Sequence, residues 1–320
     1  MTRVTSPFGW ESTAEEVSEG HDLTGKRAIV TGATAGLGVE TARVLALRGA
    51  EVVLAVRDLA AAEPVVAMIG AAGGKARISP LDLSDLRSVE AFAAREVGAP
   101  LHYLINNAGI MACPLGRTAQ GFENQLGINH IAHFHLTTLL LPALKAARGA
   151  RVVAVSSSGH HWGAFDFDDP NFERTEYDPL AAYGRSKSAN VLFAVELDRR
   201  FKGDGIRAFA LMPGGIQTSL GRYMTDDVRQ RLGTDPEAAK NIRWKTVAQG
   251  SATTIWAALG RELEGKGGLY LEDCNEALPN QPGARNGVKP WALDPEQAKR
   301  LWTWTGQAIA AVSLGERDEG

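Results

Sequence analysis

Cysteine is nearly absent from this chain of 320 residues, which holds only Cys113 and Cys274 and no C-x-x-C spacing. Two isolated cysteines predict reduced, buried thiols rather than a disulfide framework or a metal site. An excess of one charge is also missing, because the formal net charge is -3 and the charges are interspersed. Without a basic stripe, a nucleic-acid partner and a polybasic membrane anchor are not expected.

Long hydrophobic runs are missing as well. The longest apolar stretch, 134–144, is interrupted by His135, Thr137, Thr138 and Pro142 and is too short to cross a bilayer. Residues 1–22 are acidic and contain no apolar run, so they do not resemble a signal peptide. We therefore expect a cytoplasmic protein with no membrane anchor that acts on small molecules. The sequence leaves a homo-oligomer open.

Short apolar runs alternate along the chain with stretches of helical periodicity. Because the strand-like runs show no polar alternation, both faces of the sheet should be covered. The pattern predicts an α/β fold, a single-domain Rossmann-type doubly wound parallel sheet with helices on both faces. The expected strands are 27–31, 51–56, 76–81, 101–106, 151–156, 207–212 and 268–271.

The length and the 44% hydrophobic content suit one large domain. We expect this domain over 23–320, including a C-terminal helix that starts at Asp294-Pro295, with 1–22 as an N-terminal extension. A capping-box pattern at 12–16 predicts a short helix in that extension. The longest helices are expected at 122–144 and 183–201. The segments 159–179, 218–243 and 275–290 are expected to be irregular.

A glycine-rich turn follows the first predicted strand. The segment TGATAGLG at 31–38 places Gly32, Gly36 and Gly38 between a strand and a helix. Glycines there allow the backbone to approach a pyrophosphate while the helix N-terminus faces its charge. A tight turn without a ligand would have the same glycines. The position at a strand end of a doubly wound sheet favours a dinucleotide site.

The choice of cofactor should be readable at the end of the second strand. Arg57 offers a planar cation for a ribose 2′-phosphate, whereas Val56 offers no carboxylate for a 2′-hydroxyl. Asp58 could instead pair with Arg57 or face the ribose. We expect NADP(H) to be preferred, with NAD(H) as the alternative.

Tyr183 and Lys187 are four residues apart and would share one face of a helix. A nearby ammonium favours phenolate, so Lys187 would lower the tyrosine pKa and fit it for acid/base work. A tyrosine and a lysine on an ordinary surface helix would give the same spacing. The catalytic reading is favoured by Ser156-Ser157-Ser158 and by Asn106-Asn107-Ala108-Gly109, which follow the two preceding strands.

Ordered motifs along the chain also carry a family resemblance. They are TGATAGLG at 31–38, LDLSD at 81–85, INNAG at 105–109, GINHIAHF at 127–134, VSSSGHH at 155–161, YGRSK at 183–187, MPGGIQT at 212–218, LYLEDCNEA at 269–277 and AKRLW at 298–302. On these motifs the chain resembles the short-chain dehydrogenases/reductases, in particular the branch of retinol dehydrogenases and WW-domain oxidoreductases. The resemblance implies an oxidoreductase that transfers a hydride between NAD(P)(H) and a fairly apolar alcohol or carbonyl compound.

The resemblance also implies residue roles. Tyr183 would be the general acid/base, Lys187 would bind the nicotinamide ribose, and Ser157 would hydrogen-bond the substrate oxygen. Asn129 would hold a water that links Lys187 to a proton relay. The expected cofactor-binding residues are Gly32, Thr34, Ala35, Gly36, Leu37, Gly38, Arg57, Asp82, Leu83, Asn107, Ala108, Gly109, Tyr183, Lys187, Pro213, Gly214, Ile216 and Thr218.

The substrate side is expected to be apolar. The insertion after Ser158 and the loop after Thr218 would close over the nicotinamide. The expected substrate-binding residues are Ser157, Trp162, Tyr223 and Trp244, with Phe165 and Met224 as further candidates for this wall. Packing of the same aromatic side chains into the core is the alternative.

Other readings of the sequence stay open. One is reduction of an activated carbon–carbon double bond, as in protochlorophyllide reductases, which use a related tyrosine and lysine. Another is a catalytically idle nucleotide sensor or scaffold with the same fold. A metal site at His130, His133, His135, His160 or His161 is not expected, because no acid or cysteine stands at ligand spacing.

Overall fold

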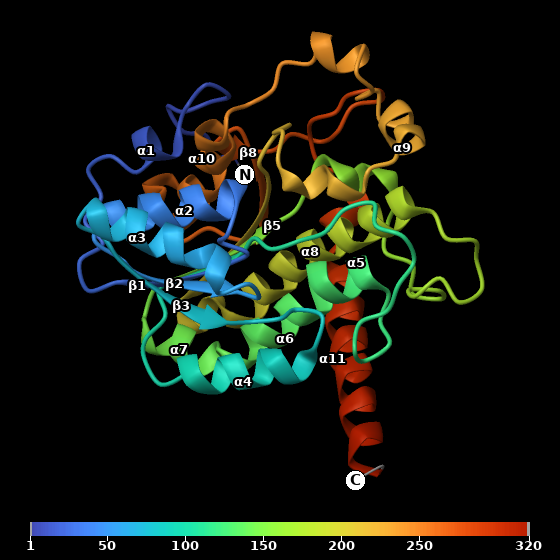
Figure 1. Ribbon diagram of the computed structural model, residues 1–320, viewed down its shortest axis with the longest axis horizontal. Coiled ribbons are helices and arrows are strands. Elements are labelled where there is room, and N and C mark those ends of the chain that lie inside the picture. Colours follow the sequence, from blue (N-terminus) through green and yellow to red (C-terminus); the bar gives the residue numbers. More distant parts are fainter. Residues whose placement is uncertain (1, 319–320) are drawn as a thin grey trace.

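The computed structural model describes residues 2–318 and is built around one eight-stranded sheet (Figure 1). The strand order is β3-β2-β1-β4-β5-β6-β7-β8, and every neighbouring pair is parallel except β7 and β8. The strands are β1 Arg27–Thr31, β2 Glu51–Val56, β3 Lys75–Pro80, β4 Tyr103–Asn106, β5 Ala150–Val155, β6 Ile206–Met212, β7 Leu269–Glu272 and β8 Asn275–Glu276. This confirms the predicted fold class.

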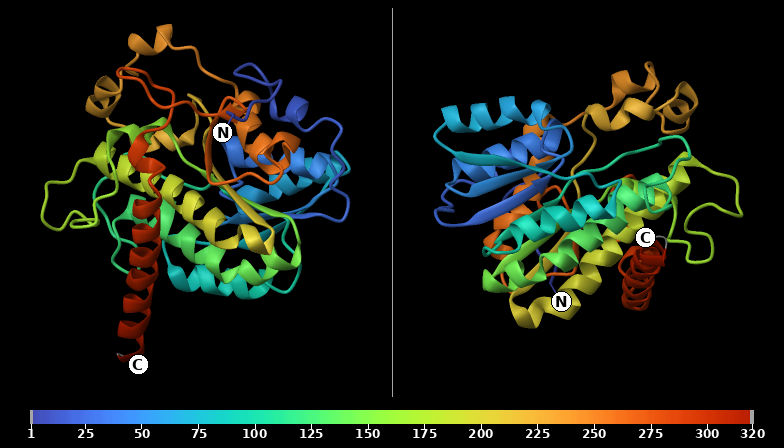
Figure 2. Two further views of the ribbon diagram at one scale, coloured as in Figure 1. Left: turned by 180° about the vertical axis from the view of Figure 1, so that it is seen from behind. Right: turned by 60° about the horizontal axis from the view of Figure 1, so that its bottom comes forward.

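Helices cover both faces of the sheet, as the apolar strands require (Figures 1 and 2). On β1, Ile29 packs into one core layer, while Ala28 and Val30 pack into the other. One layer contains α2 Gly36–Leu47, α3 Glu63–Ala71 and α10 Val247–Leu259. The other contains α4 Leu86–Glu96, α6 Ala132–Leu139, α7 Leu141–Ala146 and α8 Pro179–Phe201.

The strand order reverses direction at the centre of the sheet. The chain runs from β1 to β2 and β3 on one side, then returns to β4 on the other side of β1. The loops that leave β1 and β4 therefore diverge and open a crevice at their carboxyl ends, where doubly wound sheets bind ligands. The predicted motifs follow these strand ends.

The helix predicted at 122–144 is not continuous. It consists of α5 Asn124–Leu126, a π-helical turn at Gly127–Ile131, α6 and α7. In the π turn, the Ala132 N–H donates to the Gly127 carbonyl, one residue farther back than in an α-helix. Pro142 stands at the start of α7, where its missing N–H costs no helical hydrogen bond. Apolar periodicity alone detects neither break.

Helix α8 begins one turn earlier than predicted. The Asp178 side chain accepts hydrogen bonds from the N–H groups of Leu180 and Ala181, and Pro179 takes the first helical position. The expected irregular segments are largely confirmed, with some short helices inside them. These are the 3-10 turns Ser158–Trp162, Ser219–Tyr223 and Ala238–Asn241 and the helix α9 Asp226–Arg231.

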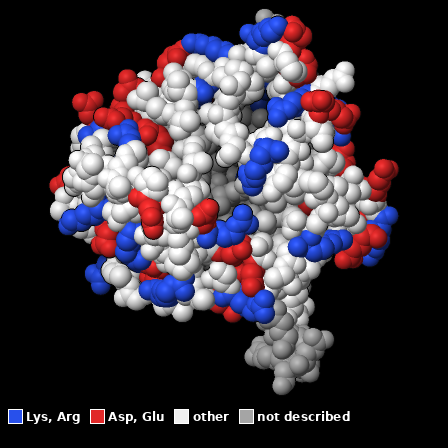
Figure 3. Space-filling view, in the orientation of Figure 1, with Lys and Arg blue, Asp and Glu red and all other residues white. Residues whose placement is uncertain are grey.

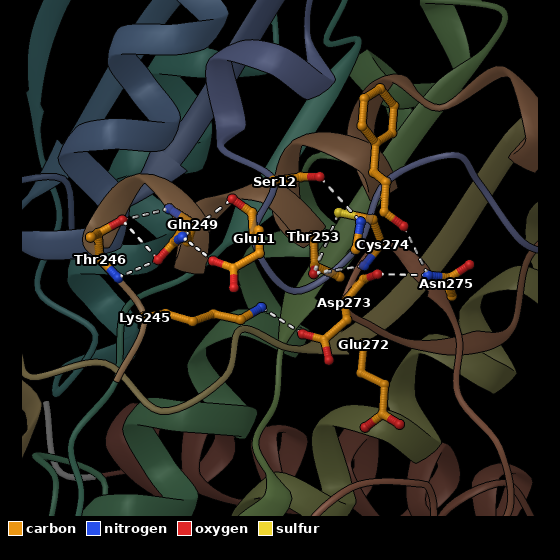
Figure 4. A network of polar contacts seen from close by, with 12 residues as sticks. Glu11, Ser12, Lys245, Thr246, Gln249, Thr253, Glu272, Asp273, Cys274 and Asn275 are labelled. Atoms are coloured by element: carbon orange, nitrogen blue, oxygen red, sulfur yellow. Dashed lines mark hydrogen bonds and ion pairs between the residues drawn. The ribbon is translucent and has the colours of Figure 1, made fainter. Parts of the chain in front are cut away.

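The two ends of the chain pack differently. The predicted capping box is confirmed at Thr13 and Glu16, which start α1 Ala14–Val17. Residues before α1 lie across the β7–β8 turn and the start of α10, where Glu11 contacts Gln249 (Figure 4). The last helix, α11 Pro295–Asp318, packs along α8 and then extends away from the body (Figure 2). Within residues 2–318, no helix combines the length and apolarity needed to cross a membrane.

Candidate active site

A cleft of about 350 Å³ opens at the carboxyl ends of β1, β2, β4, β5 and β6. Figure 3 shows this hollow in the middle of one face, with basic side chains near its rim. All of the predicted cofactor residues line it. They are Gly32, Thr34, Ala35, Gly36, Leu37, Gly38, Arg57, Asp82, Leu83, Asn107, Ala108, Gly109, Tyr183, Lys187, Pro213, Gly214, Ile216 and Thr218.

The glycine-rich turn is shaped for close backbone approach. Gly36 has φ +55°, a conformation that side chains rarely adopt, and a Cβ at Gly38 would lie 2.7 Å from Asn107 Nδ2. Ala35 precedes α2 without a side-chain cap, and the first turn holds no acidic residue. The N–H groups of that turn can therefore face an anion. These features fit the pyrophosphate of a dinucleotide.

Thr31 joins the glycine turn to the end of β4. Its Oγ1 accepts hydrogen bonds from the N–H groups of Asn107 and Ala108, each at 2.9 Å. The Asn107 side chain donates to the Thr31 carbonyl at 2.8 Å. The two strand-end motifs that the sequence placed 76 residues apart thus form one wall of the cleft.

At the end of β2, Arg57 and Asp58 both line the cleft. Asp58 accepts a hydrogen bond from the Ala61 N–H at 3.0 Å, and no ion pair within the described part of the chain involves Arg57. Asp82 accepts from the backbone and hydroxyl of Ser84. Arg57 therefore keeps its donors for a ligand, whereas Asp58 is partly used as a turn cap.

Tyr183, Ser157 and Lys187 meet in the same cleft. Tyr183 and Lys187 project from one face of α8, and Lys187 Nζ lies 5.5 Å from the centre of the tyrosine ring. Lys187 Nζ also donates to the Val155 carbonyl at 2.9 Å, which fixes it against the end of β5. The ring of Tyr183 packs so closely on Gly159 that a Cβ there would lie 2.7 Å from its Cε1.

Burial dominates the protonation of this pair. It raises the pKa of Tyr183 to about 12, against the opposing effect of a hydrogen bond with Ser157. Burial also lowers the pKa of Lys187 to about 7. The prediction of a lowered tyrosine pKa is thus reversed in this environment, because loss of hydration disfavours both charged forms. Tyr183 holds its proton throughout the neutral range.

Asn129 lies behind the cleft and is fully buried in the π turn. Its side chain exchanges two hydrogen bonds with the Ile110 backbone, both at 2.9 Å, and donates to Ser186 Oγ at 3.0 Å. Asn129 Oδ1 and Lys187 Nζ would lie 3.1 and 3.6 Å from a Cβ at Gly109. The structure therefore brings Asn129 close to Lys187, beneath the cofactor cleft.

The predicted substrate wall is only partly assembled around the cleft. Trp162 packs against the Tyr183 ring with centroids 5.9 Å apart, but Trp162 and Tyr223 are exposed and neither lines the cleft. Trp244 is fixed by a hydrogen bond to the Ala239 carbonyl. The prediction that Phe165 belongs to this wall is wrong, because its side chain is buried against Phe167 and Trp304.

An apolar cluster stands beside Tyr183 instead. It is made by Met111, Ala112, Leu180, Tyr183 and Val228, with Leu220, Met224 and Leu232 packed against it. Met224, a predicted residue of the substrate wall, packs against this cluster. The cluster joins the loop after β4 to the segment around α9, so this segment covers the tyrosine side of the cleft.

Several cleft residues were not predicted. Ile110 and Ile128 adjoin the INNAG and GINHIAHF motifs, and this adjacency was the available signal. Arg222 also lines the cleft, with its guanidinium 4.7 Å from the Tyr223 ring centre. It lies in the irregular segment, where no sequence pattern marks it.

The rings of His160 and His161 lie 4.3 Å apart, whereas the other histidines and the two cysteines have different partners. His130 contacts Thr305 of α11, and His133 contacts Thr31. Cys113 and Cys274 are free and buried, as predicted. Within residues 2–318, no group of three or more His, Cys, Asp or Glu side chains could hold a metal ion.

Comparison with known proteins agrees with this geometry. Residues 26–229 match the model of the short chain dehydrogenase family. The "Probable oxidoreductase" of Streptomyces lividans is 46% identical over 298 residues, which cover 91% of this chain and 99% of that protein. Human retinol dehydrogenase 12 is 40% identical, with 88% of this chain and 85% of that protein covered.

Solved structures show the same fold. An uncharacterized protein from Mycobacterium paratuberculosis has a TM-score of 0.71 and 34% identity, covering 91% of this chain and 96% of that one. RhlG of Pseudomonas aeruginosa, in an active-site complex with NADP, has a TM-score of 0.60 and 25% identity, covering 78% and 95%. The chain belongs to the short-chain dehydrogenase/reductase family, in its retinol-dehydrogenase-like branch, and is an NAD(P)-dependent oxidoreductase.

Proposed function

We propose that this enzyme reduces or forms a carbonyl group on a fairly apolar substrate, with Tyr183 as the proton donor or acceptor and NADP(H) as the preferred cofactor. One observation carries the proposal: Tyr183, Ser157 and Lys187 line the same cleft as the glycine turn and Arg57. A proton-transfer group and a dinucleotide cradle in one cleft suit hydride transfer coupled to proton transfer.

The cofactor supplies or accepts the hydride when bound. The chain's own residues manage the proton and the substrate oxygen. Tyr183, protonated at neutral pH because of its burial, gives its proton to the oxygen of a carbonyl undergoing reduction. Ser157 would hydrogen-bond the same oxygen, and Lys187 would bind the nicotinamide ribose. A protonated tyrosine is the form that can donate a proton during carbonyl reduction.

Arg57 supports the preference for NADP(H). Its guanidinium lines the cleft at the end of β2 and has no carboxylate partner in the described chain, while Asp58 already accepts from Ala61. An unpaired planar cation matches a 2′-phosphate, which NAD(H) lacks.

The apolar cluster of Met111, Leu180, Met224 and Val228 beside Tyr183 supports an apolar substrate. Retinol dehydrogenase 12 is named for such an alcohol. We therefore assign apolar aldehydes, ketones and alcohols as the substrate class. Cytoplasmic location and homo-oligomerisation stay predictions from the sequence.

A substrate screen tests this function. Purified enzyme is mixed with NADPH or NADH and with short, medium and aromatic aldehydes, ketones and enones, and loss of nicotinamide absorbance is followed. We expect turnover of apolar aldehydes with NADPH. Product analysis of an enone separates carbonyl reduction from double-bond reduction. Tight NADPH binding without turnover of any substrate would instead favour the idle nucleotide sensor.

A further inference from the structure

A buried histidine connects the glycine-rich turn at 31–38, here called the cofactor cradle, to α8, the helix that carries Tyr183 and Lys187. His133 is 3% exposed and lies on α6, one turn after Asn129. Its Nε2 lies 2.9 Å from Thr31 Oγ1, and its Nδ1 lies 3.1 Å from the Asn129 carbonyl oxygen. The ring thus spans the distance between the threonine that latches the cradle and the asparagine of the π turn.

The hydrogen bonds of Thr31 determine which nitrogen of the His133 ring carries the proton. Thr31 Oγ1 already accepts two hydrogen bonds, from the N–H groups of Asn107 and Ala108. A hydroxyl oxygen has two acceptor sites, so it has only its proton left to offer. The nearest acceptor for that proton is His133 Nε2, since the Ile105 carbonyl lies farther away at 3.4 Å.

The Asn129 end requires the same tautomer. A carbonyl oxygen can only accept, so His133 Nδ1 must carry the ring proton and donate it. Both ends therefore define a neutral imidazole with its hydrogen on Nδ1. Burial agrees, because it lowers the pKa of His133 to about 4. The charged or titratable groups nearest to the ring are Lys187 and His130.

The chain of contacts continues from Asn129 to the catalytic helix. The Asn129 side chain donates to Ser186 Oγ at 3.0 Å, and Ser186 Oγ donates to the Tyr183 carbonyl at 2.8 Å. A series of hydrogen bonds thus leads from the cradle to the backbone of Tyr183, through Thr31, His133, Asn129 and Ser186. Each member has a defined donor and acceptor role.

We propose that His133 is a positioning residue, which as a neutral Nδ1–H imidazole holds the π turn and Asn129 in register with the cofactor cradle. This inference rests on the proposed function of Tyr183. It gives a buried histidine outside the cleft an effect on turnover without contact with substrate.

Three substitutions separate the contributions of the two hydrogen bonds of His133, which link it to Thr31 and to Asn129. His133→Phe removes both hydrogen bonds, His133→Asn can keep only the one to Asn129, and His133→Gln can keep only the one to Thr31. Thr305→Val is the matched control, because it removes a buried hydrogen bond of the same π turn, at His130, but leaves both hydrogen bonds of His133 in place.

For His133→Phe we expect kcat to fall roughly ten-fold, because two buried polar groups lose their partner in the catalytic arrangement. KM for the aldehyde should change less than about two-fold, since His133 does not touch substrate. The Asn and Gln variants should recover part of kcat, and Thr305→Val should keep all of it. A kcat for His133→Phe like that of the parent, or an equal loss in Thr305→Val, would overturn the proposal.

A second measurement does not depend on turnover. Nitrogen NMR of histidine-labelled enzyme, assigned with His133→Gln, should show the Nδ1–H tautomer without titration between about pH 5 and pH 9. An Nε2–H tautomer or a protonated ring would contradict the link. If no carbonyl compound is turned over, this spectrum still tests the link, so its failure is distinct from failure of the proposed function.

Discussion

Tyr183 is a weak acid in this structure, because burial raises its pKa to about 12. Burial lowers the pKa of the neighbouring Lys187 to about 7. At neutral pH, burial thus keeps the Tyr183 hydroxyl protonated and removes part of the positive charge of Lys187. The sequence marks Tyr183 by its spacing to Lys187. That spacing does not report burial, which determines the protonation of Tyr183. The meeting of Ser157, Tyr183 and Lys187 in one cleft was predictable, whereas the protonation of the tyrosine was not.

Tyr183→Phe should lower kcat roughly 10²- to 10⁴-fold, the usual contribution of a positioned general acid, because only the transferring hydroxyl is removed. The dissociation constant of NADPH, measured by fluorescence, should stay unchanged. Tyr103→Phe is a suitable control, since Tyr103 stands at the opposite end of β4 from the cleft. Turnover by Tyr183→Phe within a few-fold of the parent rate would refute this mechanism.

Arg57→Gln should raise the dissociation constant of NADPH roughly 10- to 100-fold, as expected for loss of hydrogen bonds to a charged group. NADH has no 2′-phosphate, so its dissociation constant should change little. The same variant titrated with both cofactors supplies its own control. Equal weakening of the two would show that Arg57 does not recognise the phosphate.

Lys187 should also make stability depend on pH. Burial lowers its pKa from the usual 10.5 to about 7, so between these values the unfolded chain binds more protons than the folded one. The free energy of unfolding should therefore gain a contribution that rises with pH over this window. Chemical denaturation of the parent and of Lys187→Met at several pH values measures it. Identical slopes for the two proteins would exclude a lowered lysine pKa.

At the scale of elements, strand ends were predictable and helix interruptions were not. Apolar runs ending in Gly32 or Asn107 identify β1 and β4, because strand burial and turn chemistry are local. The π turn that carries Asn129 has the apolar pattern of a continuous helix, so periodicity alone does not reveal it. For the same reason, Phe165 could not be assigned to the core rather than the substrate wall from sequence.

The segment around α9 gives a prediction about substrates. Its Val228 packs with Leu180 beside Tyr183, so a longer alkyl chain would bury more apolar surface, worth about 25 cal/mol per Å². We expect kcat/KM to rise along a series of linear aldehydes until the space is filled. Val228→Asp should flatten that rise without changing the affinity for NADPH. An efficiency that falls from short to medium chains in the parent would contradict an apolar wall.

At the scale of the whole molecule, the N-terminal extension fastens distant parts of the chain. The Arg3 side chain donates to the Glu276 carbonyl, Ser6 Oγ donates to the Cys274 carbonyl at 2.6 Å, and Glu11 pairs with Arg243. None of these residues lines the cleft. The extension therefore braces the β7–β8 turn and the segment leading to α10.

Removal of residues 2–12 should lower the melting temperature by several degrees while the dissociation constant of NADPH stays the same. Glu11→Gln alone should change little, because exposed ion pairs contribute roughly 0–1 kcal/mol. Calorimetry and a cofactor titration on the two variants measure both effects. Loss of NADPH affinity at unchanged melting temperature would show that the extension belongs to the cofactor site.

The placement of β1 between β2 and β4 has a consequence for how the protein is made. Ala28 pairs with Tyr103, and the cleft takes residues from Gly32 to Arg222. Synthesis must therefore proceed beyond Arg222 before the cleft is complete. Pairings between remote segments form slowly and leave sheet edges exposed meanwhile. A dinucleotide that binds the completed cleft but not the unfolded chain would shift the folding equilibrium toward the assembled molecules.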